Sequence, residues 1–186
     1  GWSGNKVPSL SVAVREVYQF GAVIWVSWDI PVQQLSQHCG DPDCAATGIN
    51  HRGQVVGISG ICQNAVGNQS ATHAVLWQNG VPVDLGNLGG TAWHTPMAIN
   101  NQGVVVGFSD LAGDQQGSKP NFHAFEWVRP GPMHDLGTLP GDSFSHAFAA
   151  NRQTKPEGVS DAPGLASPPP FIYRGGHPAH RHPLAA

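Results

Sequence analysis

The sequence contains few charged residues and no long apolar segment. Lys, Arg, Asp and Glu make up 11% of its 186 residues, whereas an average globular protein contains about 25%. The formal net charge is −3, so the sequence lacks the basic excess that is typical of proteins that bind nucleic acid. It also lacks the run of about 18 apolar residues that a transmembrane helix needs. We therefore predict no nucleic-acid partner and no membrane span.

Familiar catalytic and metal-binding motifs are missing as well. Neither the nucleophile motif G-x-S-x-G nor the zinc motif H-E-x-x-H occurs. The segments "DPD" and "GDS" offer carboxylates, but their spacing is not that of an EF-hand or a calcium-binding nonapeptide repeat. A signal peptide is not visible at Gly1, so we expect a mature or excised segment. The motifs predict no catalytic residue, no metal site and no cofactor.

Glycine and proline, by contrast, are abundant. The chain contains 24 Gly and 16 Pro, and 40% of its residues are hydrophobic. The hydrophobic content is therefore sufficient to form a core, and the composition indicates many short strands and turns in place of helices.

The sequence repeats itself with a period of about fifty residues. "GINHRGQVVG" (48–57) is followed by "AINNQGVVVG" (98–107), and "HAVLW" (73–77) by "HAFEW" (123–127). After one inserted residue, "DLGNLGG" (84–90) is matched by "DLGTLPG" (135–141). A self-match over this many positions predicts an array of similar structural units.

The repeat extends weakly in both directions. "GAVIW" (21–25) echoes "HAVLW", and a shift of 51 brings Asn151 and Gly158 under Asn100 and Gly107, although "VVVG" has become "KPEG". In this register His146 lies under "TPM" (95–97), so it is not the counterpart of His73. The predicted organisation is a partial unit (1–45), two full units (46–97 and 98–148), a decayed unit (149–176) that has lost its "VVG" strand, and a disordered tail (177–186).

Each full unit reads as four short strands. We predict strands near 53–59, 73–78, 81–85, 103–109 and 122–128, with Asn79-Gly80 forming a hairpin turn because both residues tolerate positive φ. Four-stranded units of 40–50 residues are typical of β-propeller blades; a β-solenoid or β-sandwich is the alternative. About 3.7 periods fit the chain, so we predict an all-β, propeller-like array that is open or incompletely closed. Self-association would then follow through an unpaired apolar face, at Trp25 and Trp28 or beside the decayed unit.

Several repeated side chains have a structural interpretation. Trp77 and Trp127 lie on matching strands and are predicted to pack between units. His73 and His123 begin those strands and are predicted to hydrogen-bond to Asp84 and Asp135, which open the "DLG" segments.

The units "HAVLWQNGVPVDLGNLGG" and "HAFEW…HDLGTLPGDSFS", with "AINNQGVVVGFS", resemble the HAF repeat, a family described as a probable extracellular repeat. The resemblance covers roughly residues 21–161 and departs at Pro156-Glu157 and in the Pro- and His-rich tail. It implies an exported, largely bacterial, β-rich protein at the cell surface or outside the cell. The family implies no particular reaction.

The three cysteines leave several states open. Cys39 and Cys44 lie in "HCGDPDCAA", and Cys62 follows "QVVGIS". Export favours a disulfide, either Cys39–Cys44 or Cys44–Cys62, with one thiol left over. A zinc site with His38, Asp41, Asp43 or His51 is weakly indicated by Cys-x4-Cys spacing, and free thiols are the third state.

Long loops are predicted to share one end of the array. In a meander the tight turns "HRG" and "QNG" emerge at one end, and the long connections 60–72 and 110–122 emerge at the other, together with the links between units. Variable loops of this kind commonly bind ligands, and their aromatic side chains suit sugar rings or peptides; alternatively they fill the gap between units. The candidate binding residues are Trp93, His94, Asp142, Phe144 and His146.

Two functions of different classes follow. The first is an exported, non-enzymatic β-repeat module for binding or structural interaction, with a polysaccharide or a protein surface as partner. The second is a carbohydrate-active hydrolase or lyase, which would need acidic and basic residues converging on the long-loop end. The sequence offers few such residues there, and the fold alone cannot decide, because propellers host both functions.

Overall fold

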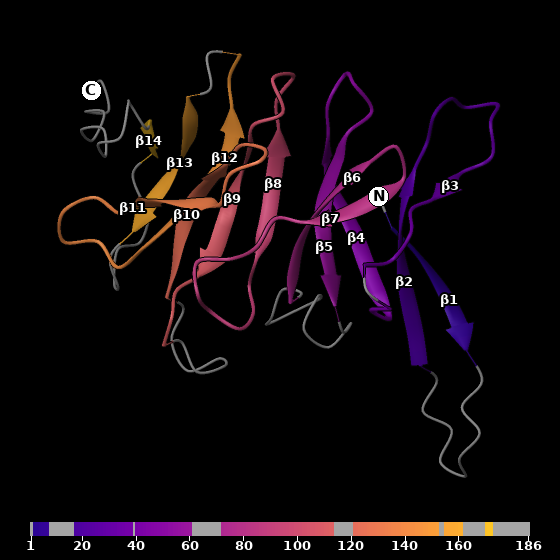
Figure 1. Cartoon of the computed structure of the whole chain (residues 1–186), viewed down its shortest axis with the longest axis horizontal. Coiled ribbons are helices and arrows are strands. Elements are labelled where there is room, and N and C mark those ends of the chain that lie inside the picture. The colour runs from indigo at the N-terminus through magenta and orange to yellow at the C-terminus, as the bar shows by residue number, and fades with distance from the viewer. Residues whose placement is uncertain are drawn as a thin grey trace, which may run out of the picture.

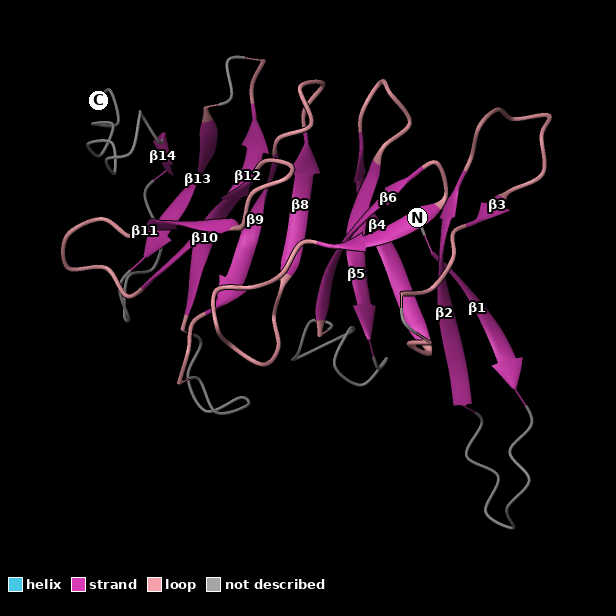
Figure 2. Ribbon diagram, in the orientation of Figure 1, coloured by secondary structure: helices cyan, strands magenta, loops and turns pink. Residues whose placement is uncertain are grey.

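The computed structural model describes residues 2–7, 17–38, 40–60, 72–113, 121–152, 155–161 and 170–172. Within these ranges all regular secondary structure is β, with fourteen strands in four antiparallel sheets. The prediction of an all-β chain is therefore confirmed (Figure 2). In the same ranges, no helix has the length and apolarity required to cross a membrane.

The four sheets follow one another along the chain and stand in a row, with the first and last at opposite ends (Figure 1). The first contains β1 (Trp2–Val7), β2 (Val17–Ile24) and β3 (Gln33–Gln34). The second contains β4 (Asp43–Ile49), β5 (Val55–Gly60), β6 (His73–Gln78) and β7 (Val81–Asp84). The third contains β8 (Thr95–Ile99), β9 (Val105–Asp110), β10 (Phe122–Trp127) and β11 (Met133–Gly137). The fourth contains β12 (Phe144–Ala150), β13 (Pro156–Asp161) and β14 (Pro170–Ile172).

The second, third and fourth sheets begin at Asp43, Thr95 and Phe144, a few residues before the predicted unit starts at 46, 98 and 149. Sequential strands pair antiparallel in all four sheets, as in a meander. The hairpin between β6 and β7 turns through Asn79 (φ 53°) and Gly80 (φ 78°), which confirms the predicted turn. His146 lies in β12, the first strand of its sheet, as the register predicted.

The core is divided into three clusters, one at each junction between neighbouring sheets. At the first junction, Ala22 and Leu35 pack against Cys44, Val75 and Trp77. Both tryptophans of the repeat, Trp77 and Trp127, are buried in these clusters, which confirms their predicted packing role. Further members are Val56, Leu76, Ile99, Val105 and Phe125 at the second junction, and Val106, Ala124, Leu136 and Ala147 at the third.

A glycine in the second strand of a sheet is required by a bulge in the first. The register shifts between Ala46 and Gly48, and a Cβ on the facing Gly57 would lie 2.0 Å from the Ala45 carbonyl oxygen. Gly107 and Gly158 face equivalent bulges, with carbonyl oxygens at 2.0 and 1.8 Å. Separations below 3.0 Å exclude any side chain there.

The predicted loss of the "VVG" strand in the last unit is wrong. β13 runs through Pro156, Glu157 and Gly158 and pairs with both β12 and β14. Pro156 is the first residue of the strand, a position that proline tolerates, and the Glu157 side chain is exposed, so it needs no buried partner. Gly158 retains the one feature that the bulge requires.

Candidate functional site

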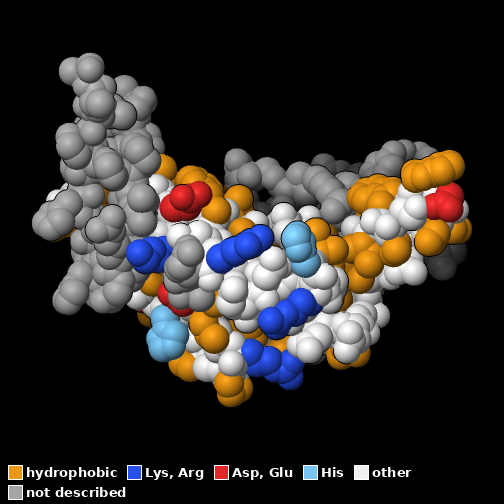
Figure 3. All heavy atoms as spheres, turned by 90° about the horizontal axis from the view of Figure 1, so that it is seen from above, with side chains coloured by type: hydrophobic (Ala, Val, Ile, Leu, Met, Phe, Trp, Pro, Cys, Tyr) orange, Lys and Arg blue, Asp and Glu red, His pale blue; other side chains and the backbone are white. Residues whose placement is uncertain are grey.

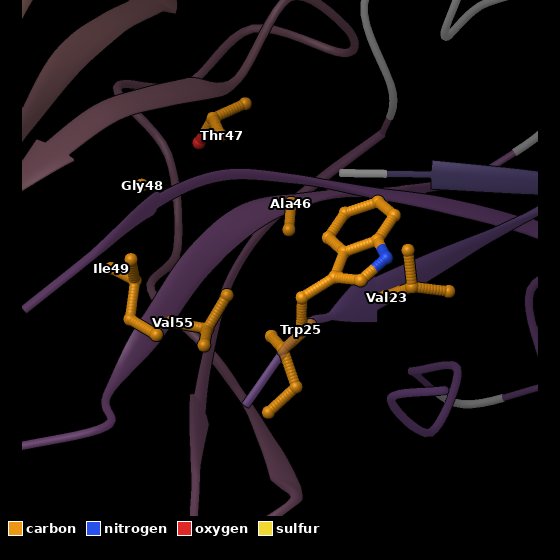
Figure 4. A pocket seen from close by; sticks show the side chains of 8 residues that line it. Val23, Trp25, Ala46, Thr47, Gly48, Ile49 and Val55 are labelled. Carbon is orange, nitrogen blue, oxygen red and sulfur yellow. The ribbon is translucent and has the colours of Figure 1, made fainter. Parts of the chain in front are cut away.

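A pocket opens at the junction between the first and second sheets. Its volume is about 210 Å³, and it lies between the end of β2 and the strands β4 and β5. Figure 4 shows Val23 and Trp25 on one side of the view and Ile49 and Val55 on the other, with Ala46 between them. The lining residues are Val23, Ile24, Trp25, Ala46, Thr47, Gly48, Ile49 and Val55. None of these side chains titrates, so the pocket is suited to an apolar or hydrogen-bonding ligand.

At the junction between the second and third sheets, the surface that corresponds to the pocket wall is covered. Pro96 and Ala46 are equivalent because each pairs with the bulge glycine of its sheet. At this second junction the Thr47 hydroxyl donates to the Pro96 carbonyl oxygen at 2.6 Å, and Gly48 lies against Met97 and Ala98. β4 and the start of β5 therefore cover the part of β8 that corresponds to the pocket wall.

Burial of one repeated isoleucine measures the difference between the two junctions. Ile99 in β8 is 7% exposed and packs in a cluster with Val56, whereas Ile49, its counterpart in β4, is 59% exposed. In the first sheet Trp2 pairs with Ala22 as Ile58 pairs with Ala74, so β1 begins at the position of Ile58. Within the described residues, the first sheet thus has no counterpart of β4, Val55 or Val56 beside the pocket.

An asparagine follows the first strand of the second, third and fourth sheets, and these asparagines link consecutive sheets. The Asn50 side-chain amide donates to the Asn100 carbonyl oxygen at 2.9 Å, and the Asn100 amide donates to the Asn151 carbonyl oxygen at 2.9 Å. The Oδ1 atom of Asn100 accepts the amides of Gln102 and Val104, which fixes the following turn. We call this series the asparagine ladder. Its repeat was visible in the sequence at 50, 100 and 151, but its role was not predicted.

Apolar side chains are also exposed around the pocket. Trp28 is 97% exposed, and Trp25 is 61% exposed although it lines the pocket. Figure 3 shows hydrophobic side chains gathered at this end of the molecule. The members of this surface, named here the N-terminal patch, are Trp25, Val26, Trp28, Ile30, Val32 and Ile49.

Two histidine–aspartate pairs occupy matching positions, as predicted. The His73 Nδ1 atom lies 3.2 Å from Asp84 Oδ2, and the His123 Nδ1 atom lies 2.9 Å from Asp135 Oδ2. In both pairs the other carboxylate oxygen accepts a backbone amide two residues later. Burial alone would raise the pKa of Asp135, but the hydrogen bonds from His123 and this amide hold that pKa below its ordinary value.

The first pair differs from the second because a third potential ligand, His38, lies beside it. The His38 Nε2 atom lies 3.9 Å from Asp84 Oδ2, and its ring lies 5.0 Å from the His73 ring. The positions equivalent to His38 are Leu88 and Leu139, which follow Leu85 and Leu136 at the same spacing as His38 follows Leu35. This histidine was named in the sequence analysis only as a weak zinc candidate beside the cysteines.

The predicted long-loop residues divide into two groups. Trp93, Phe144 and His146 come together around Phe122, with the Phe122 and His146 rings stacked 4.4 Å apart and the Trp93 ring stacked at 5.9 Å. These rings pack between the third sheet and β12, which is the gap-filling arrangement given above as the alternative. His94 and Asp142 make other contacts: the His94 Nδ1 atom is 2.8 Å from Ser109 Oγ, and the Asp142 amide donates to Leu139.

Burial makes two of these histidines weak bases. The removal of the ring from water lowers the pKa of His146 to about 4, against an ordinary 6.5, although Asp161 acts in the opposite direction. Burial also lowers the pKa of His94 to about 4. Both rings are therefore neutral near pH 7 and would resist protonation in the folded protein.

Cys44 is a free, buried thiol whose sulfur accepts the Ala22 amide at 3.2 Å. Burial raises its pKa, so it remains protonated at neutral pH. Cys39 and Cys62, the proposed disulfide partners, lie outside the described residues, and so does the predicted disordered tail. Both predicted disulfides, Cys39–Cys44 and Cys44–Cys62, need Cys44, so the free Cys44 thiol contradicts them. The disordered tail remains a prediction.

Comparisons of the chain with models of protein families, with curated proteins and with solved structures find no match.

Proposed function

We propose that this protein is a non-enzymatic β-repeat module that binds an extended polypeptide strand in its N-terminal pocket. The observation that carries the proposal is the exposure of Ile49, set against the burial of Ile99 beneath β4 and β5. The occupant would be a strand with the character of β4: small residues, then Ile-Asn, a tight turn and two valines.

The contacts at the second junction indicate how such a strand would be held. A residue in the place of Thr47 would lie against Ala46, as Thr47 lies against Pro96. An asparagine would donate to the Asn50 carbonyl oxygen, as Asn50 donates to Asn100. The valine that follows the turn would cover Ile49 and Val55, as Val56 shares a cluster with Ile99 and Val105. Strand addition of this kind gives affinity through backbone hydrogen bonds and specificity through side-chain pockets.

The finer architecture and location belong to the same proposal. The units stack like the blades of an open propeller, which is supported by the row of four sheets (Figure 1). Export to the cell surface or beyond is supported by the resemblance of the repeats to the HAF family. Fractionation of cells that make the protein from its natural gene would test the location.

A peptide tests the pocket directly. We expect a fluorescently labelled peptide of residues 45–56, "AATGINHRGQVV", to bind the full chain in an anisotropy titration. The substitution Ile49→Asp should abolish binding, because it puts a charge into the pocket wall, and it should leave the fold intact because Ile49 is largely exposed. The matched control is Val81→Asp, at an equally exposed valine outside the pocket lining.

Three outcomes would refute the proposal. They are no binding of the peptide, equal binding by the Ile49→Asp variant, and equal binding of a scrambled peptide. A peptide in which the position of Asn50 is alanine should bind more weakly, since it cannot donate to the ladder. If the free protein self-associates through the N-terminal patch, the peptide should dissociate the oligomer.

A further inference from the structure

The cluster of His38, His73 and Asp84 has the composition of a transition-metal site. Two imidazole nitrogens and a carboxylate oxygen form a ligand set that suits zinc and its neighbours. The three ligand atoms lie within 4.8 Å of one another. Ligand atoms bound about 2 Å from a tetrahedral zinc lie roughly 3.3 Å apart, close to the 3.2 Å between His73 Nδ1 and Asp84 Oδ2.

The repeat provides a comparison that separates this cluster from ordinary packing. His123 and Asp135 keep the same strand positions and the same backbone amide on Oδ1, and His123 Nδ1 lies 2.9 Å from both carboxylate oxygens. The pair is therefore sufficient for its structural role in the repeat. His38 is an addition to that pair, in a position where the other units have leucine.

Access from solvent and support from the fold both favour binding. The side chains of His38, His73 and Asp84 are 14%, 31% and 39% exposed, so an ion and a water ligand can reach them. Asp84 Oδ1 is held by the Gly86 amide at 2.8 Å, which leaves Oδ2 directed at the two rings. Fixed partners of this kind orient metal ligands.

We propose that His38, His73 and Asp84 bind a divalent zinc-class ion, with water completing the coordination. The ion takes the place of the proton between His73 Nδ1 and Asp84 Oδ2, which is released to solvent, and the His38 ring moves toward the ion. Because His38 follows the first sheet and the other two ligands lie at the ends of β6 and β7, the ion fastens the link segment to the second sheet. The site is separate from the strand-binding pocket and does not rest on its function.

Zinc binding is best measured by isothermal titration calorimetry on the full chain with His177, His180 and His182 replaced by alanine. This background removes the three histidines of the tail, which can chelate metal by themselves. We expect one zinc ion per chain. His38→Leu, which restores the residue of the other units, should weaken binding at least tenfold. The matched control His123→Gln should leave binding unchanged.

A variant that creates a second site tests the proposal without relying on a loss of zinc binding. Leu88→His should place a third donor beside His123 and Asp135 and raise the stoichiometry to two ions. Circular dichroism verifies that each variant is folded. Unchanged zinc binding in His38→Leu would overturn the proposal, as would equal loss in His123→Gln or a folded Leu88→His variant that binds no second ion.

Discussion

The first and second junctions of this array are built from equivalent strands but are covered differently. At the second, β4 lies across β8, and Ile99 is almost fully buried; at the first, the corresponding wall of β4 lines a pocket, and Ile49 is 59% exposed. Stability in repeat proteins is approximately a sum over units and their interfaces. The two junctions should therefore contribute unequally to folding, and the first contains the wall to which the proposed strand would bind.

The largest expected effect is that of truncating the two isoleucines. Ile99→Ala removes buried methyl groups from a packed cluster and should cost about 2 to 5 kcal/mol of unfolding free energy. Ile49→Ala, at the exposed counterpart, should change it by less than about 0.5 kcal/mol. Urea denaturation followed by circular dichroism gives both values. Equal costs would mean that the first junction is as closed as the second.

The asparagine ladder allows an isosteric test. Asn50→Asp keeps the Oδ1 atom that accepts the amides of Arg52 and Gln54, but it loses donation to the Asn100 carbonyl oxygen and to Gln54 Oε1. It should cost about 1 to 3 kcal/mol, since a buried hydrogen bond is lost and a charge faces a carbonyl. Asn151→Asp retains acceptance from the Lys155 amide at an exposed position, and should cost clearly less in the same denaturation experiment.

Acidic pH should destabilise the junction between the third and fourth sheets, which contains His146, more than the junction between the first and second sheets. The folded pKa of His146 is about 4, below its ordinary 6.5, so between these values the unfolded chain binds a proton that the folded chain does not. Stability due to this ring is complete above pH 6.5 and is lost as pH falls toward 4, by at most about 1.4 kcal/mol per pH unit. His146→Thr, which places the residue of the equivalent position Thr95, should flatten the dependence. A slope as steep as that of the parent chain would contradict this expectation.

The smallest effect on folding is expected from the N-terminal patch. Trp25→Ser with Trp28→Ser should change the unfolding free energy by less than about 1 kcal/mol, because both rings are mostly exposed. The same change should reduce any concentration-dependent association in sedimentation velocity. An oligomer that persists in the double variant would place its interface elsewhere.

Strand positions and turn chemistry could be predicted from the sequence because they depend on local signals. The Asn79-Gly80 turn depends on two adjacent residues, and Trp77, His73 and Asp84 recur as Trp127, His123 and Asp135 at a nearly fixed spacing. The β13 strand was missed because it was judged from the lost valines. The requirement at Gly158 comes from a bulge in β12, which is a contact between strands and leaves no local mark.

The candidate sites were harder to foresee, since both arise from differences between units. The pocket depends on which strand lies across β4, and no property of Ile49 itself distinguishes it from Ile99. His38 is recognised as a departure from the repeat only when the link segments are aligned, which places it at the position of Leu88 and Leu139. Alignment of the links as well as the strands would have found it. The aromatic contacts of Trp93 with Phe122 needed the three-dimensional arrangement of three separate segments.

The asparagine ladder also gives the array a direction. In each step the earlier unit supplies the N–H donor and the later unit supplies the carbonyl acceptor. Within the described residues the ladder begins with the Asn50 carbonyl oxygen, an acceptor, so a neighbour that continued it would bring a donor. Two N-terminal faces cannot pair in this way, because each offers only the acceptor. Contacts that continue the ladder are therefore directional and head-to-tail. Such contacts generate an open filament or a closed ring, and not a dimer with two-fold symmetry.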